Sequence, residues 1–256
     1  MSDLQSVRRA LQVLSVLQDE DELGVSEAAQ RLGVSSSTAH RLLSTMEAEG
    51  YVRHISGSRR YELGGALQSV RYSAEIDEIL DLGRVHMAAL RDRSQETVHI
   101  AMLAGTATRF LAASESPHIM RVGSRVGQRL PAHRTAAGKL LLSQLPGDEA
   151  VLRYRRTPPD SPDSVPPEAM AALVAELERT RVRGFAFNHG ESELGVAALA
   201  VPLRTPGGDS PCCLTISGPA SRINPERGPA LSEREEELLG MLRESAAAIE
   251  AGTRRA

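Results

Sequence analysis

The chain has 256 residues, of which 41% are hydrophobic and 25% charged, and this ordinary globular usage excludes a fibrous repeat or a wholly disordered chain. At roughly 150 residues per domain, the length predicts one or two domains. The formal net charge of −3 excludes nucleic-acid binding through the field of the whole molecule, so any such binding must come from local clusters of basic residues.

The cysteines and the hydropathy pattern indicate the cellular setting. Cys212 and Cys213 are the only cysteines, and adjacent cysteines rarely meet disulfide geometry, so the sequence predicts no disulfide and favours a reducing compartment. The chain contains no apolar run as long as a membrane span, and its start lacks the basic and apolar regions of a signal peptide. We therefore expect a cytoplasmic protein that does not bind membranes.

The first 50 residues predict three helices. Apolar residues recur at helical spacing over 7–17, and again over 35–49. Between these segments lies a shorter helix, 26–32. We expect Ser26 and Ser35 to be the N-caps of the second and third helices, because a side-chain oxygen there can accept a free backbone N–H of the first turn.

A change of hydrophobic period follows the third helix. Residues 51–55 and 59–63 form two short β-type runs around a Ser-Gly-Ser turn, which predicts a hairpin. Two helices joined by a short glycine-containing turn, with a hairpin behind them, are typical of a winged helix-turn-helix. The sequence therefore predicts a DNA-binding domain at the N-terminus.

The exposed side of the third helix and the hairpin carry small hydroxyls and long hydrogen-bond donors. Small residues let a helix enter the major groove, hydroxyls and helix N-termini bind phosphate, and arginine recognises guanine. Between residues 31 and 72, six arginines stand against three glutamates, a net charge of +3. An ordinary solvated helix face is the alternative, and individual base contacts stay open. The candidate DNA-contacting residues are Ser26, Ser35, Ser36, Ser37, Thr38, His40, Arg41, Ser44, Arg59 and Arg60.

The second half of the chain alternates between strand-type and helix-type patterns. The pattern over residues 66–90 predicts a helical connector, either one helix or two helices separated near Gly83. The last helix begins with a capping box formed by Ser232 and Glu235. Between these segments we expect strands at 97–103, 108–113, 119–126, 196–203 and 212–217, helices at 135–145 and 168–181, and a proline-rich loop at 157–167.

Three places in this half suit a small ligand. Residues 135–138 open a helix with small side chains, so that free N–H groups at the positive end of the helix dipole can bind a carboxylate, although tight helix packing is the alternative. Asn188 offers an amide, although a turn-forming role is the alternative. Thr215 and Ser217 lie on one face of an apolar strand, where their hydroxyls need partners from the backbone or from a ligand.

Several motifs, in order along nearly the whole chain, resemble the IclR family of bacterial transcription regulators. In the N-terminal half they are SEAA at 26–29, LGVS at 32–35, STAHRLL at 37–43, EGYV at 49–52 and YELG at 61–64. In the second half they are LPAHRTAAGKLLL at 130–142, RGF at 183–185, GESELGVAALAVP at 190–202 and ISGP at 216–219.

This resemblance implies an α/β protein of two domains. They are a winged helix-turn-helix domain over 4–65 and a GAF-like effector-binding and oligomerisation domain over 81–253, joined by a linker helix over 66–80. It further implies a homodimer or homotetramer on pseudo-palindromic operator DNA, and it favours a repressor that senses a small organic or aromatic acid. The effector residues carried over from the family are Ala136, Ala137, Asn188, Val196, Ala198, Thr215 and Ser217.

Two departures from the family pattern affect the expected ligand. Some relatives have a carboxylate where this chain has Asn188, and a cysteine where it has Ala198. A more apolar and roomier wall favours a larger or aromatic acid.

Three other functions are alternatives for this chain. Catalysis by Cys212 or Cys213 is disfavoured because a thiol in an apolar strand is usually inert, and no standard catalytic or phosphate-binding motif occurs. A zinc site built from His118, His133 and a cysteine has no standard spacing. A second half that serves only for oligomerisation or protein interaction is the third alternative. We expect no enzyme activity, no cofactor and no metal.

Overall fold

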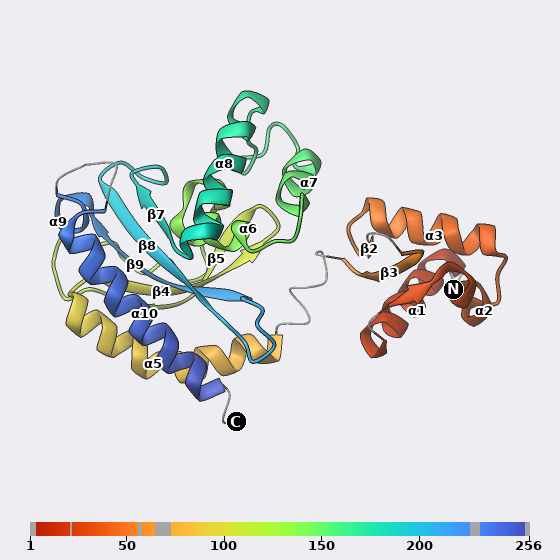
Figure 1. The fold of residues 1–256 in the computed structure, drawn as a ribbon, viewed down its shortest axis with the longest axis horizontal. Coiled ribbons are helices and arrows are strands. Elements are labelled where there is room, and N and C mark those ends of the chain that lie inside the picture. Colours follow the sequence, from red (N-terminus) through yellow and green to blue (C-terminus); the bar gives the residue numbers. More distant parts are fainter. Residues whose placement is uncertain (1–3, 21, 56–57, 65–72, 226–230, 254–256) are drawn as a thin grey trace. The chain divides into compact units, whose positions relative to one another are not determined.

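The computed structural model describes residues 4–20, 22–55, 58–64, 73–225 and 231–253. Contacts divide the chain into two units, 1–73 and 74–256. Residues 66–72 of the expected linker helix over 66–80 lie outside the described residues, and residues 73–80 form the start of a longer helix, α5. The two-domain architecture, a helix-turn-helix unit followed by an α/β unit, is confirmed (Figure 1).

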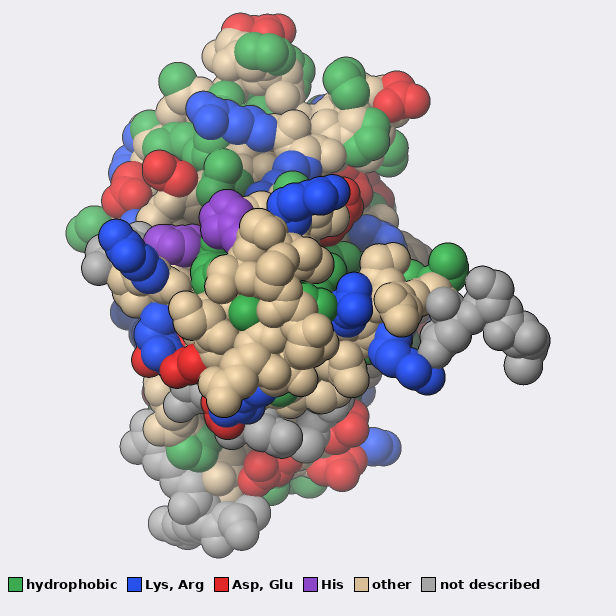
Figure 2. Space-filling model, turned by 90° about the vertical axis from the view of Figure 1, so that its right-hand side faces the viewer, with side chains coloured by type: hydrophobic (Ala, Val, Ile, Leu, Met, Phe, Trp, Pro, Cys, Tyr) green, Lys and Arg blue, Asp and Glu red, His purple; other side chains and the backbone are tan. Residues whose placement is uncertain are grey.

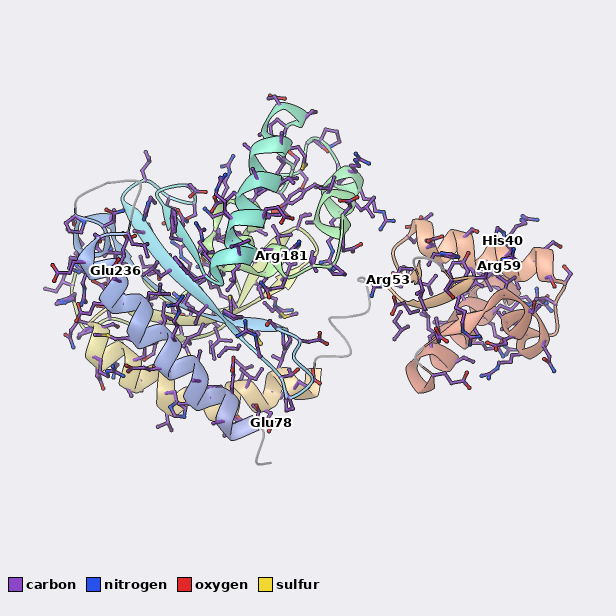
Figure 3. All side chains as sticks on the ribbon, in the orientation of Figure 1. His40, Arg53, Arg59, Glu78, Arg181 and Glu236 are labelled. Atoms are coloured by element: carbon purple, nitrogen blue, oxygen red, sulfur yellow. The ribbon has the colours of Figure 1, made fainter. Side chains whose placement is uncertain are left out.

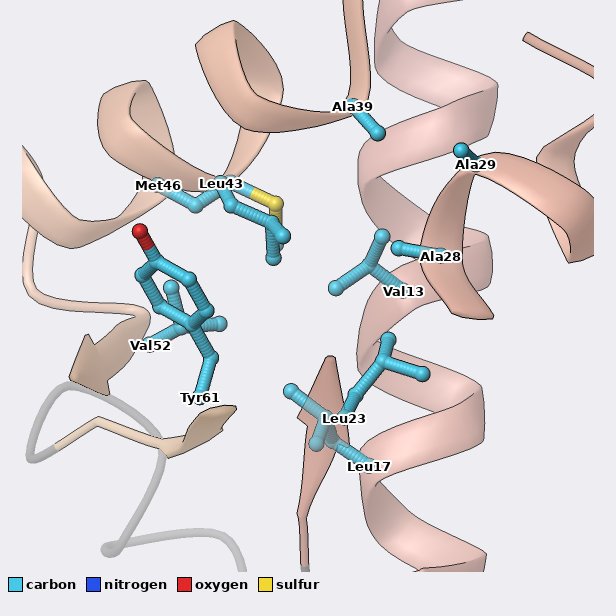
Figure 4. Packing of buried hydrophobic residues seen from close by; sticks show 10 residues of the cluster. All are labelled: Val13, Leu17, Leu23, Ala28, Ala29, Ala39, Leu43, Met46, Val52 and Tyr61. Carbon is cyan, nitrogen blue, oxygen red and sulfur yellow. The ribbon is translucent and has the colours of Figure 1, made fainter. Parts of the chain in front are cut away.

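Among the residues that the structure describes, the N-terminal unit contains three helices and a small antiparallel sheet in the order β1-β3-β2. Its core is formed by side chains from all three helices and from the hairpin, among them Val13, Leu43 and Tyr61, all less than 5% exposed (Figure 4). In chain order its elements are α1 Gln5–Asp19, β1 Leu23–Gly24, α2 Val25–Leu32, α3 Ser36–Ala48, β2 Val52–His54 and β3 Arg60–Leu63.

The start of α2 differs from the prediction that Ser26 is its N-cap. The helix begins at Val25, and Gly24 is the N-cap residue. The Glu27 carboxylate accepts the Gly24 N–H at 3.1 Å, so an acidic side chain from the first turn, rather than a serine hydroxyl, caps this end. Gly24 also lies in β1, where it pairs with Arg60 of β3. Strand β1 has only two residues, too few for a hydrophobic period to predict it.

The C-terminal unit is built on a six-stranded antiparallel sheet in the order β6-β5-β4-β9-β8-β7. Helices α5 and α10 lie side by side on one face, and α6, α7 and α8 lie over the other (Figure 1). In chain order its elements are α5 Ser73–Ser94, β4 Thr97–Ala104, β5 Ala107–Ser114, β6 Arg129–Pro131, the 3-10 turn η1 Ala132–Arg134, α6 Ala136–Ser143, α7 Glu149–Arg156, α8 Pro167–Arg183, β7 Ala186–His189, β8 Val196–Leu203, β9 Cys212–Pro219, α9 Ala220–Ile223 and α10 Glu233–Thr253.

The capping box expected at the start of α10 is confirmed. The Glu235 N–H donates to Ser232 Oγ at 3.3 Å, and the Ser232 N–H donates to the Glu235 carboxylate at 3.0 Å. No helix in the described part of the chain is both long enough and apolar enough to cross a membrane.

Two expectations about this unit are wrong. Helix α5 runs without a break through Gly83. The glycine serves packing rather than a break, because a Cβ there would lie 2.7 Å from Ile100 Cδ1 and its absence lets the helix approach the sheet. Residues 119–126 form an irregular connection rather than a strand. Side chains of β4 satisfy its backbone instead: Thr97 Oγ1 donates to the Val122 carbonyl at 2.5 Å, and the Arg125 N–H donates to His99 Nε2 at 3.3 Å.

Helix α6 is buried along its whole length, and Gly138 fixes its position. A Cβ at Gly138 would lie 2.2 Å from the Ala132 carbonyl oxygen, a backbone atom that cannot move without displacing η1. The first turn of α6 therefore packs directly on the turn that precedes it.

We expect Gly138→Ala to lower the free energy of unfolding of the C-terminal unit by about 2 kcal/mol, because the added methyl group must push backbone atoms apart. Gly240→Ala in α10 is the matched control. A Cβ at Gly240 meets no atom within 4 Å, so this substitution should raise stability by about 0.5 to 1 kcal/mol through higher helix propensity. Urea denaturation followed by circular dichroism measures both, and equal effects of the two substitutions would contradict the packing argument.

Candidate functional sites

Helix α3 divides into a core side and a solvent side. Ala39, Leu43 and Met46 are buried in the unit's core. The residues on the other side are exposed, except for the half-buried Ser44; they are Ser36, Ser37, Thr38, His40 and Arg41. Figure 3 labels His40 on this helix, and Figure 2 shows basic and histidine side chains around a surface made of backbone and of side chains that are neither charged nor hydrophobic.

The two remaining serines differ in role. Ser35 is exposed but serves the helix itself, because its Oγ accepts the Thr38 N–H at 3.3 Å and lies 3.0 Å from Ser37 Oγ. This confirms Ser35 as the N-cap of α3. Ser26 is exposed in the first turn of α2, where its hydroxyl is open to a phosphate.

The arginines predicted to contact DNA fall into two groups. Arg41 and Arg59 are exposed, and neither forms an ion pair within the described part of the chain. The Arg60 guanidinium, in contrast, lies 2.9 Å from the Glu27 carboxylate and 2.8 Å from the Glu22 carboxylate. The hydrogen bond from Gly24 and the contact with Arg60 lower the pKa of Glu27. Arg60 therefore joins the hairpin to the start of α2, a structural role that the sequence did not indicate.

The C-terminal unit contains a small cavity that is partly open to solvent. All seven effector residues expected from the sequence line it: Ala136, Ala137, Asn188, Val196, Ala198, Thr215 and Ser217. They come from α6, β7, β8 and β9, so the tertiary fold brings together segments up to about 80 residues apart. Its further lining residues, which were not among the expected set, are Phe110, Arg125, Leu130, Thr135 and Ser192.

The start of α6 forms the positive end of the cavity. Thr135 is its N-cap: its Oγ1 accepts the Gly138 N–H at 2.9 Å and lies 2.7 Å from Thr108 Oγ1. The N–H groups of Ala136 and Ala137 precede the first i to i−4 bond of the helix, so they point to the cavity end without a helical acceptor. This geometry suits an anionic or carbonyl oxygen.

The β9 wall holds a hydroxyl without a partner. Ser217 is 8% exposed, and its Oγ is buried with no hydrogen bond to any described residue. A buried hydroxyl of this kind normally has a partner. A polar atom of a ligand in the cavity would supply one.

Asn188 organises the neighbouring loop rather than offering a free amide. Its Nδ2 donates to the Arg134 carbonyl and to Ser192 Oγ, both at 2.8 Å, and its Oδ1 accepts the Glu191 N–H at 2.8 Å. The sequence placed Asn188 before a loop; the structure places it in β7, a strand of four residues that the sequence pattern did not reveal. The side chain lines the cavity but has both amide hydrogens in use.

Two ion pairs hold the residue 190–195 loop, which joins β7 to β8. Lys139 Nζ lies 2.7 Å from the Glu191 carboxylate, and the Arg125 guanidinium donates two hydrogen bonds to Glu193, at 3.0 and 2.7 Å. The bonds from Arg125 lower the pKa of Glu193. The only lysine of the chain and a cavity-lining arginine therefore both face this acidic loop.

His99 supports Arg125 from beneath. Its ring is 1% exposed, lies edge-on to Phe110 with centroids 5.2 Å apart, and accepts the Arg125 N–H on Nε2. Burial and, to a smaller extent, Arg125 lower the pKa of His99 to about 4. The ring is therefore neutral near pH 7, and because Nε2 accepts, its proton lies on Nδ1.

The cysteines and histidines considered for catalysis or zinc binding do not form a reactive or metal-binding group among the described residues. Cys212 and Cys213 are fully buried, and burial raises the pKa of Cys212 to about 12, so neither is a reactive thiol near neutral pH. His133 lies in η1 against the Tyr154 ring. Within the described residues no three His, Cys, Asp or Glu side chains come together as a metal site.

An exposed helix-turn-helix surface in one unit and a partly polar cavity in the other are typical of one class of protein: transcriptional regulators that combine DNA binding with a separate ligand-binding domain. The comparisons with known proteins agree. Models of the IclR helix-turn-helix domain and of the C-terminal domain of bacterial IclR regulators match residues 6–56 and 73–251.

Individual relatives cover most of the chain. The regulator KdgR of Escherichia coli K12 is 31% identical over 87% of this chain and 85% of its own, and the transcriptional repressor IclR of the same organism is 28% identical over 88% and 83%. The crystal structure of an IclR homolog from Microbacterium hydrocarbonoxydans, complexed with 4-hydroxybenzoate, shares the fold with a TM-score of 0.57 and 24% identity over the whole of both chains. The chain belongs to the IclR family, so it is a DNA-binding regulator of transcription and not an enzyme.

His99 gives stability a defined pH dependence. The unfolded chain takes up a proton on this histidine near pH 6.5, whereas the folded protein does so only near pH 4. Between these values the unfolded state binds more protons, so stability falls as the pH falls. We expect this residue to cost about 2 kcal/mol of stability between pH 7 and pH 5.

The measurement is urea denaturation of the wild type and of His99→Gln at both pH values. Glutamine does not titrate and still offers an acceptor to the Arg125 N–H. The variant should lose less stability than the wild type on acidification. Parallel losses in the two proteins would show that His99 is not a buried neutral group.

Proposed function

We propose that the protein binds a pseudo-palindromic operator as a homodimer or homotetramer, and that a small aromatic or other organic acid in the C-terminal cavity changes this binding. A two-fold assembly presents two α3 helices to two half-sites of the duplex. The residues proposed to contact DNA directly are Ser26, Ser36, Ser37, Thr38, His40, Arg41, Ser44 and Arg59, with Ser35 and Arg60 holding the elements that carry them.

The observation that carries the ligand proposal is the combination of charges and surfaces in one cavity. The α6 start and the Arg125 guanidinium are positive, Ser217 offers an unpartnered hydroxyl, and Phe110, Leu130, Val196 and Ala198 supply aromatic and apolar wall. A compact acid with an apolar body matches this lining. The 4-hydroxybenzoate bound to the Microbacterium homolog is such an acid, which supports the aromatic class.

We further propose repression as the mode of regulation and the cytoplasm as the location. The similarity to a transcriptional repressor supports the first point. The two buried cysteines without a disulfide, and the DNA partner, support the second. A C-terminal unit used only for protein interaction would not require an open, partly polar cavity.

The test is a fluorescence-anisotropy titration against the DNA upstream of the protein's own coding sequence, over a salt series, with a panel of aromatic and aliphatic acids. We expect saturable binding with a steep salt dependence that one acid changes. Saturable binding that no acid changes would contradict the effector proposal. It would favour the alternative in which the C-terminal unit serves only oligomerisation or protein interaction.

We expect Arg41→Ala to weaken specific operator binding by about 1 to 3 kcal/mol while it changes non-specific binding little, because a base contact contributes mainly to specificity. Arg59→Ala should weaken binding to all sequences and reduce the slope of log K against log salt by about 0.9, the value for one phosphate contact. Arg84→Ala, exposed on α5, is the control and should change neither. Anisotropy with operator and scrambled duplexes separates the two effects.

A larger side chain at Ala198 should close the cavity. We expect 4-hydroxybenzoate to raise the melting temperature of the wild type and Ala198→Leu to abolish this shift, because the added atoms occupy the space of the ligand. Ala172→Leu makes the same change on the exposed side of α8 and should leave the shift intact. Operator binding without acid should persist in both variants. A full shift in Ala198→Leu would place the ligand elsewhere.

A further inference from the structure

The Arg125–Glu193 ion pair connects opposite edges of the six-stranded sheet. Arg125 belongs to the connection between β5 and β6, at one edge, and Glu193 belongs to the loop between β7 and β8, at the other. Their side chains meet over the central strands β4 and β9, whose residues His99 and Ser217 lie beneath the connection and the cavity. The pair therefore joins two loops that are distant in sequence, and its Arg125 member forms part of the cavity wall.

The two members of the pair differ in exposure. The Arg125 side chain is 14% exposed and lines the cavity, whereas the Glu193 side chain is 49% exposed and is not among the lining residues. An enclosed guanidinium needs an anion, since an unpaired buried charge is strongly unfavourable. A half-exposed carboxylate, in contrast, can move to water at little cost. The arginine must keep an anionic partner, but Glu193 need not be that partner.

The loop that carries Glu193 has a second attachment and a glycine at each end. Glu191 binds Lys139, which is 4% exposed and lies outside the cavity, so this ion pair holds the loop to α6 independently of Arg125. Gly190 and Gly195 flank the loop with φ values of +87° and +80°, a region where glycine carries no steric penalty. Release of Glu193 can therefore move the tip of the loop while its base stays attached.

We infer that Glu193 and the carboxylate of the effector compete for Arg125, so that Arg125 is the residue that selects an acid over its neutral analogue. The inference rests on the proposed function and adds to it the charge-selecting residue and the internal group that the ligand displaces. The exchange breaks the Arg125–Glu193 hydrogen bonds, forms equivalent bonds to the ligand carboxylate and places Glu193 in water. The residue 190–195 loop then loses its attachment to the opposite edge of the sheet.

The test is calorimetric titration of the full chain with 4-hydroxybenzoate and with 4-hydroxybenzamide, which has the same ring but no charge. We expect Glu193→Gln to bind the acid about fivefold more tightly than the wild type, because the competing anion is gone. Its affinity for the amide should not change. Arg125→Gln should weaken acid binding by about tenfold or more, and Glu193→Gln should bring no gain when combined with it.

Glu191→Gln is the matched control, since it makes the same change in the same loop but at the attachment to Lys139. It should not raise acid affinity. An equal gain in Glu191→Gln and Glu193→Gln, or a gain for the amide as well, would mean that loosening of the loop is the cause, and would overturn the competition.

Failure of the inference and failure of the proposed function are distinguishable. Equal affinity of the wild type for acid and amide would leave an aromatic cavity and refute the role of Arg125. Absence of binding of both probes to all variants would refute the aromatic-acid proposal and the inference with it.

Discussion

The C-terminal unit depends on the close contact between the first turn of α6 and the η1 turn before it. Gly138 permits this contact, because a Cβ there would lie 2.2 Å from the Ala132 carbonyl oxygen. The same turn places the N–H groups of Ala136 and Ala137 at the cavity and Lys139 under the residue 190–195 loop. One steric constraint thus fixes both the partial positive charge of the helix start and the attachment of the loop that borders the cavity.

The role of each arginine depends on whether a carboxylate lies beside it. Arg60 is held by Glu27 and Glu22, so its charge stabilises the helix-turn-helix unit, whereas Arg41 is exposed and forms no ion pair with a described residue. Arg125 lies between these cases, because its carboxylate partner, Glu193, is half-exposed. A protein of net charge −3 can therefore bind anions in both units through local placement of a few cations.

A ligand changes DNA binding only if it binds two arrangements of the protein with different affinity. Within the C-terminal unit, two adjacent residues of β7 bond in different directions, one to the loop beside the cavity and the other to the start of α10. Asn188 in β7 orders the residue 190–195 loop, and the next residue, His189, lies with Nε2 2.5 Å from the Glu235 carboxylate that caps α10. The end of β7 therefore contacts both the residue 190–195 loop and the start of α10, a helix that packs along β8.

The sequence by itself determined the winged helix-turn-helix, the N-cap of α3, the main strands and the seven cavity residues, because helical and strand periods, capping residues and family motifs are local signals. Tertiary structure alone decided the unbroken path of α5 through Gly83, the irregular course of residues 119–126, the pairing of Arg60 and the place of Arg125 at the cavity. Each of these depends on which side chain or backbone group arrives from a distant segment. Packing distances and ion-pair partners depend on residues that are distant in sequence, so no periodic pattern in the sequence indicates them.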